Sequence, residues 1–574
     1  MTIKNSLSLL FRKYSVFRVF SYLVLIAIAL TVISIATVKS KKIPVIDSVI
    51  PVVGSPGDEM IIRGSNFGDS RETNFVEIGG NRITASGYIT WSDNFIKIIL
   101  PSNVQDGLVI VSTQAGNSKP GFFANQAGIP VALPPETKTS LPVITGINPS
   151  SGGYGSLVTI SGSDFGTVRG ESKVYFTSNA EVSHSVKGQG EVPNDFDFSI
   201  IAASESDFDY EYWSDSEIRV RIPDGAASGN IFVETDKGRS NPISTEIKLT
   251  AGTKEYEDQK TYILQVNADI DSLDSKNGTN ITLRFPRPVV LSWQPMVSLI
   301  DCNPDPMISD YKNTVIHQVT LKRASNQNRQ NKKLKFSQNF AVSTYAVHTQ
   351  INPKAVRPFS NKKRILYKNS VEADQLIKSS DEKVLELVKE IAGKETNPYN
   401  LAKLAYSYMI QNYTIQHELR KGESSPLDLL KKKRGDAYDF AILYTTLLRA
   451  MGIPANPLAG ILVDSELKSK SHWWTEFYIE GFGWVPVDIA LAKGLPYNSF
   501  KSVENPEEYY FGNIDGQHIA FSKGWNEIKQ TISQNSKIVY RPRSYALQSI
   551  WEESSEGNVN YSSLWNDPVI TGLY

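Results

Sequence analysis

Residues 434–462 read RGDAYDFAILYTTLLRAMGIPANPLAGIL, and residues 472–490 read HWWTEFYIEGFGWVPVDIA. The first stretch predicts a helix from about Ala437 to Met451, which ends at Gly452 because glycine readily adopts the left-handed conformation that closes a helix. We expect strands at 457–463, 472–479 and 484–488, the last two joined by a Gly-Phe-Gly turn. Helices followed by antiparallel strands indicate an α+β domain, placed at residues 365–524.

Two more helices are expected upstream. Ser379 and Glu382 have the spacing of a capping box, and apolar residues follow at helical spacing: Val384, Leu385, Val388 and Ile391. A second helix is expected to begin at Asn400, with an inward face made of Leu401, Leu404, Ala405 and Tyr408.

The two quoted stretches resemble the core of the transglutaminase-like (papain-like cysteine) superfamily, and YYFGNIDGQHIAFSKG at 509–524 resembles the tail that follows this core in many bacterial members. In that family a helix begins at G-x-C, one strand carries H-x-W-x-E, and the next ends G-W-x-x-x-D. The helix dipole favours the cysteine thiolate, the histidine takes its proton and the aspartate orients the histidine. The matching positions in this chain are Gly435, Ala437, His472 and Asp488.

Alanine therefore stands where the nucleophile should be, and a methyl group cannot attack an acyl carbon. Asp436 suits the positive end of the helix dipole, but its charge would oppose a neighbouring thiolate. We expect no catalytic residue among the triad positions Ala437, His472 and Asp488, and we interpret the domain as inactive. The alternative is an active peptidase or acyl transferase that uses another, unidentified nucleophile.

Four residues around the vacated site are candidates for a ligand groove: Asp436, Trp473, Trp474 and Trp484. Tryptophans at such positions more often belong to a core, but an aromatic groove would suit an extended peptide or glycan. The basic run 431–434 indicates a solvated loop, or, on the rim of a cleft, a preference for anionic ligands. The sequence thus predicts a binding or scaffold protein for a peptide, a protein or a cell-envelope polymer.

Residues 43–125 and 141–250 are two copies of one repeat. Pro51, Gly57, Gly64 and Phe67 recur 98 positions later, whereas the motif Trp-Ser-Asp at 91–93 recurs 122 positions later, so the second copy carries a 24-residue insertion. Short β-rich runs between Gly and Pro turns predict β-sandwiches. The copies resemble IPT/TIG immunoglobulin-like domains, and the resemblance implies spacers or adhesive modules.

The insertion interleaves acidic and aromatic residues, and its spacing is unlike that of an EF-hand. We expect a solvated surface hairpin carrying Glu191, Asp195, Asp197, Glu205, Asp207, Asp209 and Glu211.

Residues 260–360 read as a further β-sandwich, similar to the β domain that often precedes a bacterial transglutaminase-like core. Cys302 is the single cysteine and lies in this region, where we expect an inert thiol rather than a nucleophile. Residues 525–574 are predicted to be a C-terminal extension.

Residues 19–38 form an uncharged apolar run long enough to cross a bilayer, which predicts a transmembrane signal anchor after a short cytoplasmic N-terminus at 1–18. The bulk of the chain is then extracytoplasmic. Lys+Arg and Asp+Glu number 60 each, so no net charge favours nucleic acid. One cysteine and six histidines without metal-ligand spacing predict no metal site and no cofactor.

Overall fold

The computed structural model describes residues 22, 24, 26, 42–125, 140–180, 196–275, 279–310, 313–321, 332–418, 427–524, 538–540, 551–554 and 559–574. The chain divides into two compact units, residues 1–131 and 132–574. The predicted N-terminus at 1–18 and membrane anchor at 19–38 lie outside the described residues, except for three positions in the anchor. Among the residues that are described, no helix has the length and hydropathy of a bilayer-spanning segment.

The first repeat is a sandwich of two sheets. Alternate residues of its inner strands, such as Met60, Ile62, Ile96 and Ile98, are fully buried, which is the period-two pattern of a half-buried strand. The sheet orders are β1-β3-β7-β6 and β2-β10-β8-β4-β5, with β9 paired to β8. The strands are β1 (Val45–Ile50), β2 (Val53–Gly54), β3 (Glu59–Ser65), β4 (Phe75–Ile78), β5 (Asn81–Arg82), β6 (Tyr88–Ser92), β7 (Phe95–Ile99), β8 (Gly107–Thr113), β9 (Gly116–Asn117) and β10 (Gly121–Asn125).

The second repeat has the same topology, with sheet orders β11-β13-β17-β16 and β12-β20-β18-β14-β15, and with β19 paired to β18. Its strands are β11 (Val143–Asn148), β12 (Ser151–Gly152), β13 (Leu157–Ser163), β14 (Lys173–Ser178), β15 (Ile200–Ala202), β16 (Tyr210–Trp213), β17 (Glu217–Arg221), β18 (Ala226–Thr235), β19 (Gly238–Arg239) and β20 (Ile243–Ile247). The identical strand order confirms that the repeat seen in the sequence is a structural one.

The β-rich region that follows is built on two long antiparallel strands, β21 (Gly252–Ser275) and β25 (Lys332–Ile351). They form one sheet with β23 (Met296–Asn303), while β22 (Thr279–Pro286) and β24 (Thr314–Leu321) form another. Buried alternate residues of β21 and β25 make its core: Tyr262, Leu264, Val266, Ala268, Phe336, Phe340 and Val342.

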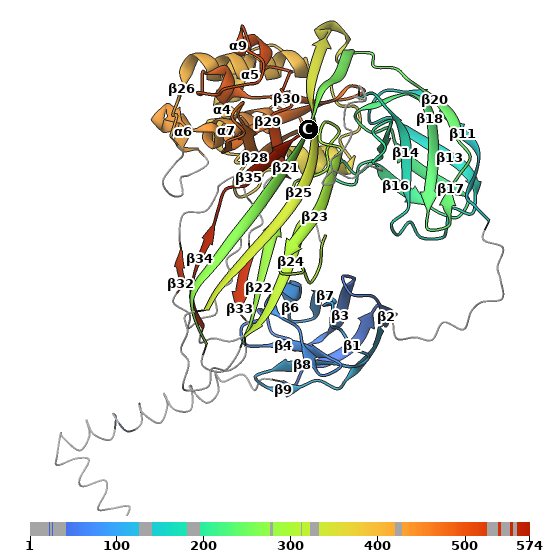
Figure 1. Ribbon diagram of the computed structural model, residues 1–574, viewed down its shortest axis with the longest axis vertical. Coiled ribbons are helices and arrows are strands. Elements are labelled where there is room, and N and C mark those ends of the chain that lie inside the picture. The colour runs from blue at the N-terminus through green and yellow to red at the C-terminus, as the bar shows by residue number, and fades with distance from the viewer. Residues whose placement is uncertain are drawn as a thin grey trace, which may run out of the picture. The chain divides into compact units, whose positions relative to one another are not determined.

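The described residues of the C-terminal extension, predicted at 525–574, add strands to these same two sheets. Strands β34 (Val559–Trp565) and β35 (Val569–Leu573) pair with β21, and β33 (Trp551–Ser554) pairs with β22. Strand β32 (Ile538–Tyr540) pairs in turn with β34. Figure 1 shows the red strand β34 beside the green β21. The sequence analysis did not predict this pairing, because strand pairing between distant segments leaves no local signal in the sequence.

In the sequence, the α+β domain lies between strand β25 and the C-terminal strands of the β-rich region. Its four-stranded sheet has the order β30-β29-β28-β31, and it contains β28 (Ala455–Val463), β29 (Ser469–Ile479), β30 (Gly483–Val487) and β31 (His518–Lys523). Helix α7 (Ala437–Ala450) packs on β28 and β29, and α4 (Glu382–Ala392) and α5 (Pro398–Asn412) pack on α7 (Figure 1). The remaining short elements are α3 (Ile365–Val371), β26 (Thr414–Ile415), α6 (Asp428–Lys432), β27 (Arg434–Gly435), α8 (Ile489–Ala492) and α9 (Pro506–Tyr509).

The predicted helix starts need correction. The N-cap of α4 is Asp381, whose carboxylate accepts from the backbone of Lys383, so Ser379 is not the cap. The N-cap of α5 is Asn397, followed by proline at the first helical position, which is a stronger start signal than Asn400.

Two leucines expected on buried helix faces are exposed. Leu385 is 39% exposed and Leu404 is 41% exposed. The buried arc of α5 is centred on Ala402, Ala405 and Met409, and at 100° per residue Leu404 lies beyond its edge.

Candidate functional site

Helix α7 begins at the position where the family places its nucleophile. Asp436 is the N-cap, and its carboxylate accepts from the backbone N–H of Asp439 at 3.2 Å. Asp439 reciprocates by accepting from the backbone N–H of Asp436 at 3.1 Å, which completes a capping box. Ala437 is 4% exposed and presents only its methyl group. The helix start is thus built for stability and carries no nucleophilic atom at residue 437.

Strand β29 contacts α7 through one set of alternating side chains. The ring of Trp473 meets that of Tyr438 edge to face at 4.8 Å, and the hydroxyl of Thr475 donates to the carbonyl of Ala441 at 3.2 Å. Successive strand residues point to opposite faces, so His472 and Trp474 share the other face, where their rings stack at 6.0 Å.

On that face His472 joins two residues from other elements. The Nε2 atom of His472 lies 2.5 Å from Oδ2 of Asp488, at the end of β30. The Nε2 atom of His518, at the start of β31, lies 3.1 Å from the same oxygen. Asp515 accepts from Nδ1 of His518 at 2.9 Å. All three of His472, Asp488 and His518 are 1% exposed or less, so the network is enclosed.

The network consists of buried ionisable groups that shift one another's pKa values. Burial alone would raise the pKa of Asp488, but the adjacent rings of His472 and His518 hold it well below its usual range. Burial lowers the pKa of His518, while Asp515 and Asp488 raise it, and the outcome is a pKa of about 9. The two carboxylates on either side of His518 thus favour the protonated form of its ring.

His518 and Asp515 were not recognised as site residues from the sequence. They lie in the 509–524 segment, and only the return of β31 to the far side of β28 brings His518 to Asp488. Gly460 of β28 permits this approach, because a Cβ there would overlap the carbonyl oxygen of Ile519. His472, Asp488 and His518 lie far apart along the chain but come together in the folded protein as a group that could hold a metal ion. The absence of a metal site, inferred from spacing along the chain, stays a prediction.

The four groove candidates do not line an accessible groove. Asp436 is 3% exposed, Trp473 and Trp474 are 2%, and Trp484 is 5%. Trp474 packs between His518 and Trp293. The expectation is corrected because these aromatic rings fill the spaces between elements and leave no open face.

Trp484 contacts the second repeat. Its indole N–H donates to Asp207 at 3.0 Å, and its backbone N–H donates to Asp224 at 2.8 Å. Lys523 lies over the Trp484 ring at 3.9 Å and pairs with both Asp207 and Glu476, at 2.7 and 2.6 Å. The second repeat is therefore docked on the α+β domain through a network of buried charges.

The acidic stretch of the second repeat is consequently only partly a solvated hairpin. Asp197, Glu205 and Glu211 are exposed, as expected, whereas Asp209 is 3% exposed and faces Arg364 at 3.9 Å. Glu191 and Asp195 lie outside the described residues. The prediction missed the docking because the cations that receive Asp207 and Asp209 come from another domain.

Two further candidates from the sequence are inert in this structure. The basic residues 431–434 are all exposed, and Lys432 pairs with Asp428 at 2.8 Å. Cys302 lies on β23 opposite Gln338, and burial raises the pKa of its thiol to about 11. A thiol with a raised pKa is a poor nucleophile at neutral pH.

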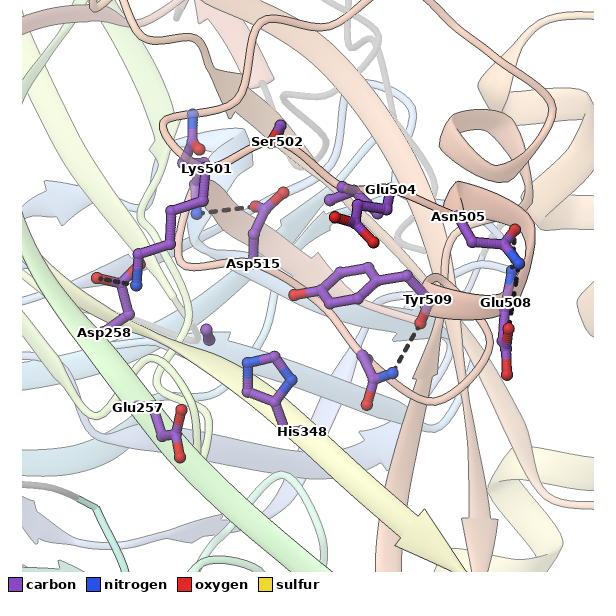
Figure 2. A pocket seen from close by; sticks show the side chains of 14 residues that line it. Glu257, Asp258, His348, Lys501, Ser502, Glu504, Asn505, Glu508, Tyr509 and Asp515 are labelled. Atoms are coloured by element: carbon purple, nitrogen blue, oxygen red, sulfur yellow. Dashed lines mark hydrogen bonds and ion pairs between the residues drawn. The ribbon is translucent and has the colours of Figure 1, made fainter.

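A cavity of about 470 Å³ opens between β21, β25 and the segment 501–517 (Figure 2). His348 and Tyr509 meet edge to face in its wall at 5.8 Å, and Lys501 is neutralised by Asp258 at 3.3 Å. The lining is otherwise acidic, with Glu257, Glu504, Glu508 and Asp515. Asp515 thus faces this cavity on one side and holds His518 on the other.

Comparison with known proteins assigns the domains. Residues 385–489 match the Transglutaminase-like superfamily, and residues 44–127 and 142–190 match the IPT/TIG domain. An uncharacterized protein of Haemophilus influenzae is 28% identical, over 29% of this chain and 54% of its own length. The cyclomaltodextrin glucanotransferase of Paenibacillus macerans is 29% identical over 14% of this chain and 11% of the enzyme. The chain therefore spans about half of one curated relative and a small part of the other.

Two solved structures are similar in part. A proposed cysteine protease from Cytophaga hutchinsonii is 16% identical, with a TM-score of 0.35 over 55% of this chain and 93% of that one. The periplasmic domain of TgpA from Pseudomonas aeruginosa is 13% identical, with a TM-score of 0.23 over 42% of this chain and 90% of that one. By its matched residues, this chain carries a transglutaminase-like domain together with IPT/TIG domains.

Proposed function

We propose that this protein is a membrane-anchored, extracytoplasmic binding or scaffold protein whose transglutaminase-like domain is catalytically inactive and recognises a peptide, a protein or a cell-envelope polymer. The observation that carries the proposal is Ala437 at the start of α7, where the family's mechanism needs a thiol. The proposed anchor is the apolar run at 19–38, and the domains that follow it are of kinds expected outside the cytoplasm.

The surroundings of residue 437 support inactivity. The capping box brings the carboxylates of Asp436 and Asp439 close to residue 437, where a thiolate would have to form, and like charge disfavours that ionisation. His472 and Asp488 remain, but they are enclosed with His518 rather than open to a substrate. This arrangement is expected of a domain that retains its fold without catalysing a reaction.

The ligand would use another surface, because the groove candidates are buried. The cavity beside β21 and β25 offers one, with the Tyr509 ring and several carboxylates in its wall (Figure 2). Such a wall suits an apolar body that carries positive charge, as in a basic peptide or an amino-sugar polymer.

The catalytic part of the proposal is tested with the full chain purified in detergent. Peptide hydrolysis and amine incorporation should stay at background for the wild type and for His472→Ala. Ala437→Cys should also fail to turn over, because restoring the thiol leaves the Asp436 charge and the enclosure in place. Turnover by the wild type that disappears in His472→Ala would establish the alternative, an active peptidase or acyl transferase with another nucleophile.

The binding part is tested against isolated cell-wall polymer and a peptide array. Tyr509→Ala should weaken retention, and His472→Ala should not, since His472 is 1% exposed. Tyr212→Ala is the matched control, because Tyr212 is an exposed tyrosine of the second IPT/TIG domain, away from the cavity. Equal retention of wild type and Tyr509→Ala would move the ligand away from the cavity.

A further inference from the structure

We propose that His472, Asp488 and His518 form a buried site for a divalent transition-metal ion, zinc above all, which ties together β29, the end of β30 and the start of β31. This inference does not rest on the proposed function, since an ion could hold these strands in a binding protein or in an enzyme. It would give the histidine and aspartate at the family's triad positions, His472 and Asp488, a structural role.

The donor set is the first argument. Each residue offers one ligand atom, and these atoms all lie within 4.8 Å of one another. Two imidazoles and one carboxylate form a set that suits zinc and its first-row neighbours, whereas calcium and magnesium prefer oxygen alone. Three protein ligands are also the number that zinc uses when a water molecule completes its tetrahedron.

The distances need little adjustment. Nε2 of His518 and Oδ2 of Asp488 are 3.1 Å apart, and Nε2 of His472 is 2.5 Å from the same oxygen. Donor atoms on a tetrahedral zinc ion stand roughly 3.3 Å apart, because each bond is about 2.0–2.2 Å long. The ion therefore requires the His472 contact to open by roughly 0.8 Å, with the protons of the present hydrogen bonds released to solvent.

The outer residues are arranged as they are around known zinc ligands. Asp515 accepts from Nδ1 of His518 at 2.9 Å, which leaves Nε2 free to coordinate. Asp515 is itself held by the backbone N–H of Gln517 at 3.0 Å and by the hydroxyl of Tyr510 at 3.3 Å. The second oxygen of Asp488 accepts from the backbone of Leu491 at 2.9 Å, so its first oxygen is fixed toward the histidines.

The charge of the buried cluster suits a bound cation. Asp488 and Asp515 bring two carboxylates to an enclosed cluster, and a divalent ion with two neutral imidazoles would balance them. The Asp515 side chain is 15% exposed and lines the cavity of Figure 2, so the outer end of the network meets solvent.

The decisive measurement uses the wild-type full chain in detergent. We expect stoichiometric zinc by mass spectrometry after dialysis against metal-free buffer, or stoichiometric uptake when zinc is added. Cobalt should replace it and give the visible absorption of a low-coordinate nitrogen and oxygen site. Zinc should also raise the Tm, and a chelator should lower it. If the wild type neither holds nor takes up metal, and neither zinc nor the chelator changes its Tm, the three residues are only a hydrogen-bonded network.

Variants locate the site. His518→Gln should weaken zinc binding by about 100-fold or more, and Asp515→Asn by about 10- to 100-fold, the usual effect of removing an outer partner. His317→Gln is the matched control, since His317 is also fully buried but lies in the β-rich region, bonded to Gln338. Zinc that survives in His518→Gln and is lost in His317→Gln would overturn the assignment. Because the wild-type measurement stands alone, a variant that fails to fold leaves the proposal testable.

Discussion

In the first IPT/TIG domain the indole N–H of Trp91 donates to the carbonyl of Phe67 at 3.2 Å, and in the second Trp213 makes the same bond to Phe165 at 3.1 Å. In each copy the tyrosine three residues earlier accepts a backbone N–H from the neighbouring sheet. The strand orders are also the same. The two copies thus share both fold and internal bonding.

Their outer surfaces differ. The second copy has Asp224 in the buried network with Lys254 and Trp484, and the first copy has the exposed Ser102 at the matching position. Asp207 and Asp209 of the second copy likewise correspond to Ala85 and to a glycine in the first. These carboxylates join the second copy to the transglutaminase-like domain within one compact unit, and the first copy has other residues at the matching positions.

The largest effect is expected from Asp224→Ala. Asp224 accepts from Lys254 at 2.7 Å, from Tyr256 at 2.8 Å and from Trp484 at 2.8 Å, and its loss strands a buried ammonium. We expect a cost of about 3–5 kcal/mol, seen as a lower Tm by calorimetry. Ser102→Ala, the same position in the first copy, should change stability by less than about 0.5 kcal/mol. Similar shifts in both variants would contradict the docking.

The next effect depends on pH. Burial and the charge of Asp207 raise the pKa of Asp209 to about 8, above its ordinary value of 3.8, so the folded protein holds an extra proton between these values. The stability that this proton contributes is present at low pH and is lost as pH rises through about 8.

We therefore expect Asp209→Asn, which keeps the shape but does not titrate, to remove a decline of roughly 3–4 kcal/mol between pH 5 and pH 8. Thermal unfolding at several pH values measures it, with the exposed Glu205→Gln as the control. A wild type whose stability rises over this range would be the opposite result.

A smaller and equal effect is expected from Trp91→Phe and Trp213→Phe. Each removes one side-chain hydrogen bond to a backbone carbonyl, at a cost of about 1 kcal/mol to its own domain. Calorimetric transitions of the two units measure the losses separately. A much larger loss in one copy would show that the internal bonding of the repeats is not equivalent.

The smallest effect is expected from Ala85→Asp, which places in the first copy the carboxylate found at Asp207 in the second. Without a partner such as Lys523, the added charge should change the Tm of the first unit by less than the equivalent of about 0.5 kcal/mol. A clear stabilisation there would reveal a cationic partner surface for the first copy.

Local patterns predicted much of the architecture. The spacing of Gly, Pro and Trp revealed both repeats, and the stretch from Gly435 to Asp488 indicated the helix, the strands and the missing cysteine. The predictions that failed concern features that depend on contacts between distant segments. The identity of the α4 N-cap was missed because Ser379 and Asp381 are both good caps, and geometry alone selects Asp381.

In the candidate site, too, local motifs predicted some residues, and contacts between distant segments decided the others. His472 and Asp488 could be named from motifs, but His518 reaches them through a crossover of the sheet that no spacing encodes. The groove candidates failed because aromatic residues beside a vacated site can either line it or fill it. Burial of Trp473, Trp474 and Trp484 shows that they fill the interior.

The pairing of β34 and β35 with β21 has a consequence for biosynthesis. Strand β21 is synthesised before its partners β34 and β35, which follow the whole transglutaminase-like domain in the sequence. One edge of this long strand therefore stays unpaired until the later segment has been made, and a chain truncated before β34 would leave that edge open to other nascent chains.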